Sequence, residues 1–498
     1  MRNIFTVFIT TILLTSASLA QWTDYQSAEF VIGQPDLITN LGACSANGLW
    51  GPYSVAIDFQ HSKLYVGDAD NHRVLRYAYP LTGNQPTAEL VFGQSNFTTD
   101  SVQDFYNRMG FWPTPTPKQI LYPMAIAVYN GDLWVLDEFN NRVVKFSQAY
   151  NQTSNNPDAN VVIGQSNFAT NGGACTPYSF ATPWGMTIDD SGNLWVADAG
   201  NGRVLRFNDA SSLAIGDTAT GVLGQTDFIT GTRASTPTQN QFNIASSLCF
   251  SGTTLWVCDR QFNRVLRFDS AATKPNGANA DGVLGQSDFT SSTYGTTPST
   301  FHQPFGVCAD GKGNLYVSDQ LNNRVVIFLS AANKSNGANA DNELGQSSFY
   351  TTSHTYDSTG FAPGSVTNFA VDNANGKLFV VDRVGMRVMQ FAASSPLTGV
   401  GPNETSGFSG VPNQFRLSNY PNPFNPSTQI TFSVPKVTNV TLKIYDLLGR
   451  EIAILVNERK QAGEYAVTWD AEGVPSGVYF YRIVAGDFIQ TNKMMVDK

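Results

Sequence analysis

The chain has 498 residues, a formal net charge of −9 and only 14% charged residues. This length allows two or three domains with large cores. An acidic chain lacks the basic footprint that phosphate binding requires, so we expect no nucleic-acid partner and no plain electrostatic docking on anionic lipid. Aromatic residues make up 12% of the chain and glycines number 43, a composition typical of many short strands joined by turns.

The first twenty residues predict a secretory signal peptide. Arg2 supplies a positive charge, residues 4–14 are apolar except for threonines, and Ser-Leu-Ala at 18–20 offers small residues to a peptidase. We expect cleavage before Gln21. No later segment is long and apolar enough for a membrane span, so no integral membrane segment is expected after cleavage.

A repeated pattern organises the chain between about residues 28 and 392. Six segments share an aromatic residue, a valine one position on, an aspartate two positions later, and an Arg-Val pair five residues after that aspartate. The segments are LYVGDADNHRVLRY, LWVLDEFNNRVVKF, LWVADAGNGRVLRF, LWVCDRQFNRVLRF, LYVSDQLNNRVVIF and LFVVDRVGMRVMQF. The repeated aspartates are Asp68, Asp137, Asp198, Asp259, Asp319 and Asp382. Self-similarity at a near-constant period indicates a repeat architecture.

Each repeat resolves into four expected strands, as the third one illustrates. They cover residues 183–189, 193–198, 203–207 and 222–225. Four-stranded sheets repeated six times around an axis form a β-propeller, and the repeated aromatic residues would fill the wedges between its blades. We therefore predict an all-β fold with a six-bladed propeller over residues 21–395.

A Gly-Gln pair at the end of each fourth strand is out of phase with the aspartates. The glycines of these pairs are Gly33, Gly93, Gly164, Gly224, Gly285 and Gly345. One pair precedes the first aspartate and none follows the sixth. Residues 28–33 should therefore form the outer strand of the sixth blade, beside residues 387–391, and close the ring.

The six segments resemble NHL repeats. The pattern of that family is a Pro-Gly-Ala-like first strand, a Leu-aromatic-Val-x-Asp second strand, and an Asn-x-Arg-Val turn. The resemblance covers about residues 28–392, although Phe262 and Gly385 stand where asparagine is usual. It implies a propeller, and some NHL-like propellers are metal-dependent lyases.

A second domain follows a segment rich in Pro, Gly, Ser and Asn at residues 396–416, which we interpret as a linker. Residues 417–498 contain strand patterns at 429–434, 440–445, 465–469 and 478–484. Short strands with turn signals predict a small C-terminal β-sandwich of the immunoglobulin-like kind.

Four stretches of this domain resemble the type A sorting domain of type IX secretion cargo. They are YPNPFNPST (420–428), VTLKIYDLLGREI (440–452), AGEYAVTWDA (462–471) and PSGVYFYRI (475–483). The resemblance implies that the type IX machinery recognises residues 417–498. It places the chain outside a Gram-negative bacterium, either secreted or on the outer cell surface.

The six Asp-x-x-Asn-x-Arg turns could line a site, but their repetition in every blade favours a scaffold role. We expect the carboxylates to accept main-chain hydrogen bonds within the turns. On that basis Asp198→Ala should lower stability by about 1–2 kcal/mol.

Residues that could bind a metal ion are sparse. The four histidines, His61, His72, His302 and His354, have no metal-binding spacing, which disfavours zinc. Two Asn/Asp-Gly loops at 276–282 and 336–342 leave calcium as an alternative to plain turns. No cofactor is predicted, no catalytic residue is identified and the metal ligands are unknown.

The five cysteines form an odd set for an exported chain. Cys44 and Cys175 each lie ten residues after the Gln of a Gly-Gln pair, in comparable loops, and could form a disulfide if those loops fold over the same face. The other three lie within strand patterns and are expected to be buried thiols.

The long loops between blades are where we expect binding. They cover residues 95–121, 166–182, 226–243, 287–303 and 347–363. Their aromatic residues could stack on sugars, anchor a protein or pack on the loops themselves. The candidate binding residues are Arg108, Phe111, Trp112, Tyr178, His302 and His354.

We therefore expect a secreted or cell-surface binding or scaffold module, and not an enzyme. Its partner at the loop face would be an extracellular protein or a glycan. One alternative is a metal-dependent lyase or hydrolase at the channel mouth. Another is a structural component of a surface layer.

Overall fold

The computed structural model divides the chain into two compact units, Met1–Gly399 and Val400–Lys498. The structure describes residue 22, residues 24–110 and 112–393, and residues 416–496 without 421–423, 435, 448, 462 and 487. The predicted signal peptide and all but the last residue of the predicted linker's 396–416 range lie outside these residues. No helix within them is long and apolar enough to cross a bilayer.

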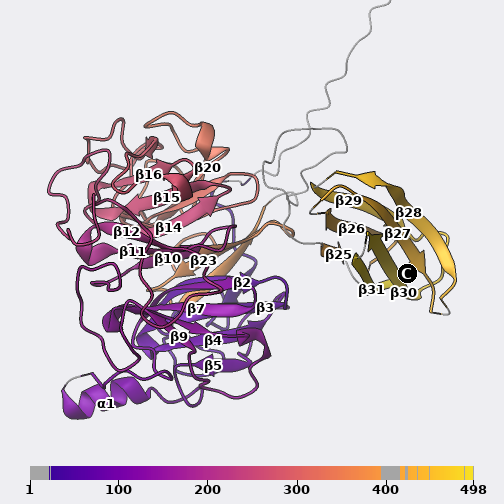
Figure 1. Cartoon of the computed structure of the whole chain (residues 1–498), viewed down its shortest axis with the longest axis horizontal. Coiled ribbons are helices and arrows are strands. Elements are labelled where there is room, and N and C mark those ends of the chain that lie inside the picture. The colour runs from indigo at the N-terminus through magenta and orange to yellow at the C-terminus, as the bar shows by residue number, and fades with distance from the viewer. Residues whose placement is uncertain are drawn as a thin grey trace, which may run out of the picture. The chain divides into compact units, whose positions relative to one another are not determined.

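The first unit contains six four-stranded antiparallel sheets, the blades of a propeller (Figure 1). Blade 1 contains β2 (Pro52–Asp58), β3 (Lys63–Asp68), β4 (Arg73–Ala78) and β5 (Leu90–Phe92). Blade 2 contains β6 (Pro123–Tyr129), β7 (Asp132–Asp137), β8 (Arg142–Phe146) and β9 (Val161–Ile163). Blade 3 contains β10 (Gly185–Ile188), β11 (Leu194–Asp198), β12 (Arg203–Phe207) and β13 (Gly221–Leu223).

The remaining blades follow the same order until the last strand. Blade 4 contains β14 (Ala245–Ser251), β15 (Thr254–Asp259), β16 (Arg264–Phe268) and β17 (Gly282–Leu284). Blade 5 contains β18 (Pro304–Ala309), β19 (Leu315–Asp319), β20 (Arg324–Phe328) and β21 (Asn342–Leu344). Blade 6 combines β22 (Val366–Asp372), β23 (Lys377–Asp382) and β24 (Arg387–Ala392) with β1 (Phe30–Ile32).

The first strands of neighbouring blades contact one another in order around the ring. β2 contacts β6, β6 contacts β10, and the series continues to β22, which contacts β2. These strands therefore surround the axis, and the sheets extend outward from them. The prediction of an all-β, six-bladed propeller is confirmed.

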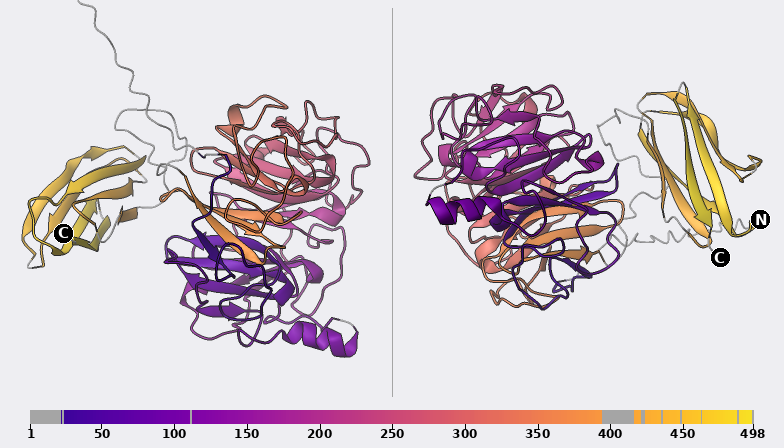
Figure 2. Two further views of the ribbon diagram at one scale, coloured as in Figure 1. Left: turned by 180° about the vertical axis from the view of Figure 1, so that it is seen from behind. Right: turned by 90° about the horizontal axis from the view of Figure 1, so that it is seen from below.

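The ring closes through the N-terminal strand, as the phase of the Gly-Gln pairs predicts. β1 pairs antiparallel with β24, with Phe30 opposite Gln390 and Ile32 opposite Val388. Figure 2 shows the indigo N-terminal segment against the orange strands of the last blade. Trp22 is buried beside blade 5, where its Nε1 donates to the hydroxyl of Tyr316 at 3.0 Å. The N-terminal segment thus contacts both blade 5, through Trp22, and blade 6, through β1.

A short 3-10 turn follows the second strand in five blades and presents the repeated aspartate to its arginine. These turns are η1 (Ala69–Asn71), η2 (Glu138–Asn140), η4 (Ala199–Asn201), η5 (Arg260–Phe262) and η7 (Gln320–Asn322). Further 3-10 turns after third strands are η3 (Ala149–Asn151), η6 (Ala271–Thr273) and η8 (Ala331–Asn333).

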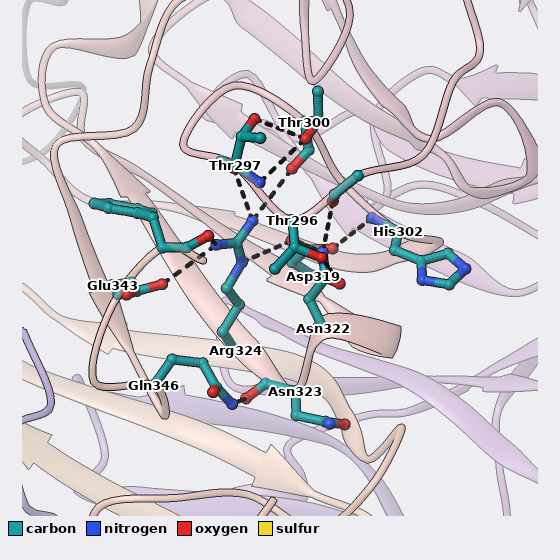
Figure 3. A network of polar contacts seen from close by, with 12 residues as sticks. Thr296, Thr297, Thr300, His302, Asp319, Asn322, Asn323, Arg324, Glu343 and Gln346 are labelled. Carbon is teal, nitrogen blue, oxygen red and sulfur yellow. Dashed lines mark hydrogen bonds and ion pairs between the residues drawn. The ribbon is translucent and has the colours of Figure 1, made fainter. Parts of the chain in front are cut away.

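The Asp–Arg pair of each turn is a buried ion pair, shown for blade 5 in Figure 3. Arg324 donates from Nε to Asp319 at 2.8 Å, and both side chains are 0% exposed. Its Nη1 donates to the carbonyl of Phe349, and its Nη2 donates to the carbonyl of Thr297. The arginine therefore joins the loop before its blade to the loop after it.

The glutamine of each Gly-Gln pair is also structural. In blade 3, Gln225 is buried, and its side-chain amide nitrogen, Nε2, donates to the carbonyls of Gly202 and Thr232. The preceding glycines take positive φ: Gly164 has φ +90°, and a Cβ there would lie 2.2 Å from the ring of Phe180. Both residues of the pair are thus fixed by the turn they occupy.

An asparagine from the next blade covers the edge of several outer strands. Val222 in β13 donates its main-chain N–H to Oδ1 of Asn276, and Val283 in β17 donates to Oδ1 of Asn336. Covering an edge in this way blocks pairing with another chain. These two asparagines belong to the loops considered for calcium, and their side-chain oxygens accept hydrogen bonds from the main chain instead.

The structure corrects one expectation for the loops and answers the question that the sequence left open for two cysteines. Residues 95–121 contain a helix, α1 (Ser101–Met109), which Asp100 caps by accepting a hydrogen bond from the N–H of Gln103 at 2.9 Å. No disulfide joins Cys44 to Cys175. Their thiols occupy equivalent places in blades 1 and 3, near the carbonyls of Phe97 and Phe228.

The second unit is a β-sandwich of two antiparallel sheets. One contains β25 (Arg416–Tyr420), β26 (Ser427–Val434) and β29 (Gly463–Asp470). The other contains β27 (Thr438–Tyr445), β28 (Glu451–Lys460), β30 (Gly477–Ala485) and β31 (Phe488–Val496). Side chains of both sheets share one core, including Phe432 and Trp469 from the first and Leu442 and Tyr481 from the second.

We predict that deleting residues 21–36 destabilises all six blades together. The deletion removes β1 and Trp22, so β24 and the apolar faces beside it become exposed. Calorimetry of the variant should show one propeller transition at a lower temperature. Hydrogen exchange should accelerate in every blade, and acceleration confined to β22–β24 would contradict a cooperative ring.

We predict that Asp198→Ala lowers the free energy of unfolding by about 3–5 kcal/mol, because it leaves Arg203 as a buried, unpaired charge. Both side chains are 0% exposed, and Nε of Arg203 lies 2.7 Å from Oδ2 of Asp198. This burial raises the expected loss above the value of about 1–2 kcal/mol predicted from the sequence. Denaturant unfolding measures the change. The double variant Asp198→Ala/Arg203→Met should recover part of the loss, and an equal or larger loss would argue against the charge explanation.

Candidate functional site

A pocket of about 430 Å³ lies where the six blades converge. Its aromatic lining comes from Tyr53, Tyr122, Phe139, Trp184 and Phe305. Its charged lining comes from Glu138, Arg260 and Arg383. These residues stand at or beside the starts of first strands and in the turns after second strands. The pocket therefore opens at the axis, on the face that carries the repeated turns, and we call it the axial pocket.

Arg383 is held on one side of the axial pocket by three neighbours. Its Nη2 lies 3.3 Å from Oδ2 of Asp70 and 3.2 Å from the hydroxyl of Tyr122. Tyr122 donates its hydroxyl hydrogen to Asp70 at 2.9 Å. The guanidinium also lies over the ring of Tyr53, 4.8 Å from its centroid, in cation–π geometry. Its Nε is buried without a hydrogen-bond partner among the described residues.

Arg260 projects from the blade 4 turn. Its Nη2 donates to Oε1 of Gln320 at 3.2 Å, so its nearest polar partner is a neutral amide. Its Nε is buried and, within the part of the chain that the structure describes, has no hydrogen-bond partner. Burial lowers the pKa of Arg260 below its usual value.

Glu138 projects from the blade 2 turn and is 7% exposed. Its Oε1 accepts a hydrogen bond from Nε1 of Trp184 at 2.9 Å. Burial raises the pKa of Glu138 to about 7, against the opposing effect of the Trp184 hydrogen bond. The carboxyl group is thus largely neutral in mildly acidic solution.

The sequence analysis did not identify these lining residues, although the repeat contains a signal for them. Glu138, Arg260, Gln320 and Arg383 each directly follow a repeated aspartate. The aspartates are the same in every blade because they build the turn. The following position carries different residues in blades 2, 4, 5 and 6, where it lines the pocket, so variation within the repeat would have indicated the pocket.

Among the residues proposed from the sequence, Trp112 of the first long loop lies close to a ring that lines the axial pocket. Trp112 stacks on Tyr106 with ring centroids 4.2 Å apart and lies 6.3 Å from the ring of Phe139, which lines the pocket. Arg108 is exposed on α1. Phe111 lies outside the described residues.

The other proposed residues do not line the axial pocket. Tyr178 is 50% exposed in the loop before blade 3. The ring of His302 stacks on Tyr294 with centroids 4.5 Å apart, and the main-chain N–H of His302 donates to Oδ1 of Asp319. His354 is exposed in the loop before blade 6. No group of three or more His, Cys, Asp or Glu side chains in the described ranges could hold a metal ion.

Two family models match the chain. Residues 418–497 match the secretion system C-terminal sorting domain, and residues 180–207 match the NHL repeat. The second range begins before β10 and ends with β12 of blade 3. No curated protein matches the chain.

Solved structures similar to the chain share little sequence with it. A structural genomics protein of unknown function from Bacteroides thetaiotaomicron is 12% identical, with a TM-score of 0.45 over 74% of this chain and 75% of its own. PorZ, a surface component of the type IX secretion system of Porphyromonas gingivalis, is 14% identical, with a TM-score of 0.35 over 89% and 59%. Virginiamycin B lyase from Staphylococcus aureus is 11% identical, with a TM-score of 0.36 over 68% and 94%.

The propeller assignment rests on the sheet order and the closed ring of first strands in this chain. The assignment of an export route rests on the match between its C-terminal unit and the secretion sorting domain. The chain is therefore a six-bladed β-propeller in which residues 180–207 match the NHL repeat, with a C-terminal secretion sorting domain that indicates export by the type IX system to the cell surface or beyond it.

Proposed function

We propose that this chain is an extracellular binding module and that its axial pocket takes an anionic ligand. The observation that carries the proposal is the pair of arginines, Arg260 and Arg383, whose Nε atoms are buried and lack partners in the described ranges. A buried donor without an acceptor costs about 1–3 kcal/mol. A ligand oxygen in the pocket would satisfy such donors and recover that energy.

The charges of the axial pocket support an anion. Asp70 lies beside Arg383, whereas Arg260 has Gln320 as its polar partner. Glu138 is largely uncharged below pH 7, because burial raises its pKa to about 7. Below pH 7 the pocket therefore carries net positive charge in a chain whose formal charge is −9, and this contrast would concentrate an anion at the axis.

The export route supports a ligand found outside the cell. The sorting domain directs the chain to the surface or the medium, and the axial pocket lies on the face that carries the long loops between blades. The combination of aromatic faces with a few polar groups is typical of small-molecule sites. A binding role accounts for these features without requiring catalytic residues.

We predict that Arg260→Ala and Arg383→Ala each weaken anion binding about 10- to 100-fold, the effect of losing one charge-assisted hydrogen bond. The purified chain is titrated with glucuronate, citrate and inorganic sulfate, with neutral glucose for comparison, and binding is measured by calorimetry. Arg233→Ala, an exposed arginine in the loop before blade 4, is the matched control and should bind as the parent does. If no anion binds, or if all three variants behave alike, the axial pocket is not the site.

We predict that Glu138→Gln stabilises the propeller at pH 8 but not at pH 5. The pKa of Glu138 is about 7 in the fold against 4.5 for the ordinary group, so ionisation costs the parent stability as pH rises through this window. The glutamine keeps an acceptor for Trp184 and cannot ionise. Denaturant unfolding should show the variant gaining about 2 kcal/mol relative to the parent between the two pH values.

The control for this measurement is Asp158→Asn, because the Asp158 side chain is 61% exposed. Its stability relative to the parent should change little with pH. A Glu138→Gln variant with the same behaviour would mean that the Glu138 carboxyl ionises in the fold as it does in water.

A further inference from the structure

The lining of the axial pocket is mainly apolar, and part of that apolar surface is exposed. Besides its aromatic residues, the pocket is lined by Met124 and Leu321. Phe139 is 42% exposed and Leu321 is 38% exposed. Leu321 is the more open of the two, because the ring of Phe139 stacks on Tyr122 with centroids 4.8 Å apart. A ligand that removes such a side chain from water gains free energy, so the lining favours a ligand with an apolar body.

The exposed leucine lies beside a cationic group. Leu321 directly follows Gln320 in η7 of blade 5, and Oε1 of Gln320 accepts a hydrogen bond from Nη2 of Arg260 at 3.2 Å. The main-chain N–H of Leu321 donates to the carbonyl of His302, which fixes the leucine in its turn. Blades 4 and 5 therefore present a positive charge and an apolar side chain to the same pocket.

Polar groups of the aromatic lining already have partners within the protein. The hydroxyl of Tyr122 donates to Asp70 at 2.9 Å, and Nε1 of Trp184 donates to Glu138 at 2.9 Å. To donate to a ligand hydroxyl, either group would have to give up or share its present bond, and the exchange gains little free energy. The pocket is thus better suited to a ligand with one anionic group than to a polyol.

We propose that the axial pocket selects a small monocarboxylate with an apolar body. The carboxylate lies at the arginines, Arg260 and Arg383, and the apolar body covers Leu321 and contacts Met124. A volume of about 430 Å³ is that of a small-molecule site. This inference rests on the proposed anion binding at the axis and adds the chemical class of the ligand.

Other small ligands leave part of the axial pocket unsatisfied. Sulfate or citrate would pair with the arginines but leave Leu321 exposed to water. A neutral apolar molecule would cover Leu321 but offer no acceptor to the buried Nε atoms of Arg260 and Arg383, which lack partners among the described residues. A carboxylate joined to an apolar group meets both requirements.

The test is the dependence of affinity on the length of the apolar body. Acetate, butanoate and hexanoate are titrated into the purified full chain by calorimetry at pH 6, where Glu138 is largely neutral. Affinity should rise about two- to fourfold for each added methylene group. Hexanamide has the same body without the charge and should bind at least tenfold more weakly than hexanoate. Glucuronate, a polar anion of the same charge, should also bind more weakly than hexanoate.

Variants locate the two parts of the ligand. Leu321→Ser should weaken hexanoate binding about three- to tenfold and leave acetate and sulfate binding unchanged, which also shows that the variant is folded. Leu321→Met keeps an apolar side chain and should retain most of the affinity for hexanoate. Arg260→Ala should weaken the binding of all three carboxylates.

The matched control is Ile229→Ser, which removes a 74% exposed apolar side chain from the loop after β13 and should not alter hexanoate binding. Phenylacetate distinguishes the two kinds of apolar body. Tighter binding of phenylacetate than of hexanoate would identify an aromatic body and the reverse an aliphatic one, and either result supports the inference.

Four outcomes would overturn the inference. If acetate binds as tightly as hexanoate, or if glucuronate binds more tightly, the apolar body is wrong while the anion site stands. If hexanamide matches hexanoate, the pocket does not select a carboxylate. If Leu321→Ser and Ile229→Ser affect hexanoate equally, the gain with chain length arises outside the axial pocket. If no anion binds at all, the proposed function and this inference fail together.

Discussion

The buried Asp–Arg pair at the turn of each blade is the interaction on which the rest of the propeller depends. Burying two charges is expensive, and it is tolerated only where hydrogen bonds satisfy their remaining donors and acceptors. In blade 5 the Nε of Arg324 bonds to Asp319, while its two Nη atoms bond to carbonyls of the loops before and after the blade. One side chain thereby fixes two long loops.

The same pair positions the axial pocket. Glu138 and Arg383 directly follow the aspartates of blades 2 and 6, so the rigid turn holds the first atoms of each pocket side chain. The turn is uniform around the ring, and the adjacent residue can vary without disturbing it. A site with its own charge pattern can therefore be built on a repeated scaffold.

Repetition decides which parts of the structure are predictable from the sequence. The propeller, the strand ends near the repeated residues and the pairing of residues 28–33 with blade 6 follow from patterns that occur six times. α1 occurs once, within a long loop, and its nine residues give little signal against the repeats. In the second unit β28 was not predicted, because it exposes much of both faces and lacks a clear alternation of apolar residues.

The shared pattern alone did not indicate the axial pocket, because several of its residues occupy the position after the repeated aspartate, where blades 2, 4, 5 and 6 carry different residues. The loop residues chosen from the sequence were aromatic or basic, which is a sound choice of chemistry. Of these, Trp112 lies within reach of a pocket residue, Phe139. Distance from the axis depends on how the loops fold over the blades, and local sequence does not encode that.

The closing strand also sets the order of events during synthesis. β1 is among the first parts of the mature chain to be made, yet its partner β24 ends at Ala392, after the other blades are complete. Before β24 is made, the main-chain groups of β1 have no strand to pair with, and the blade 6 residues that pack around Trp22 are incomplete. A chain that ends before β24 cannot close its ring, so ring closure requires the complete propeller.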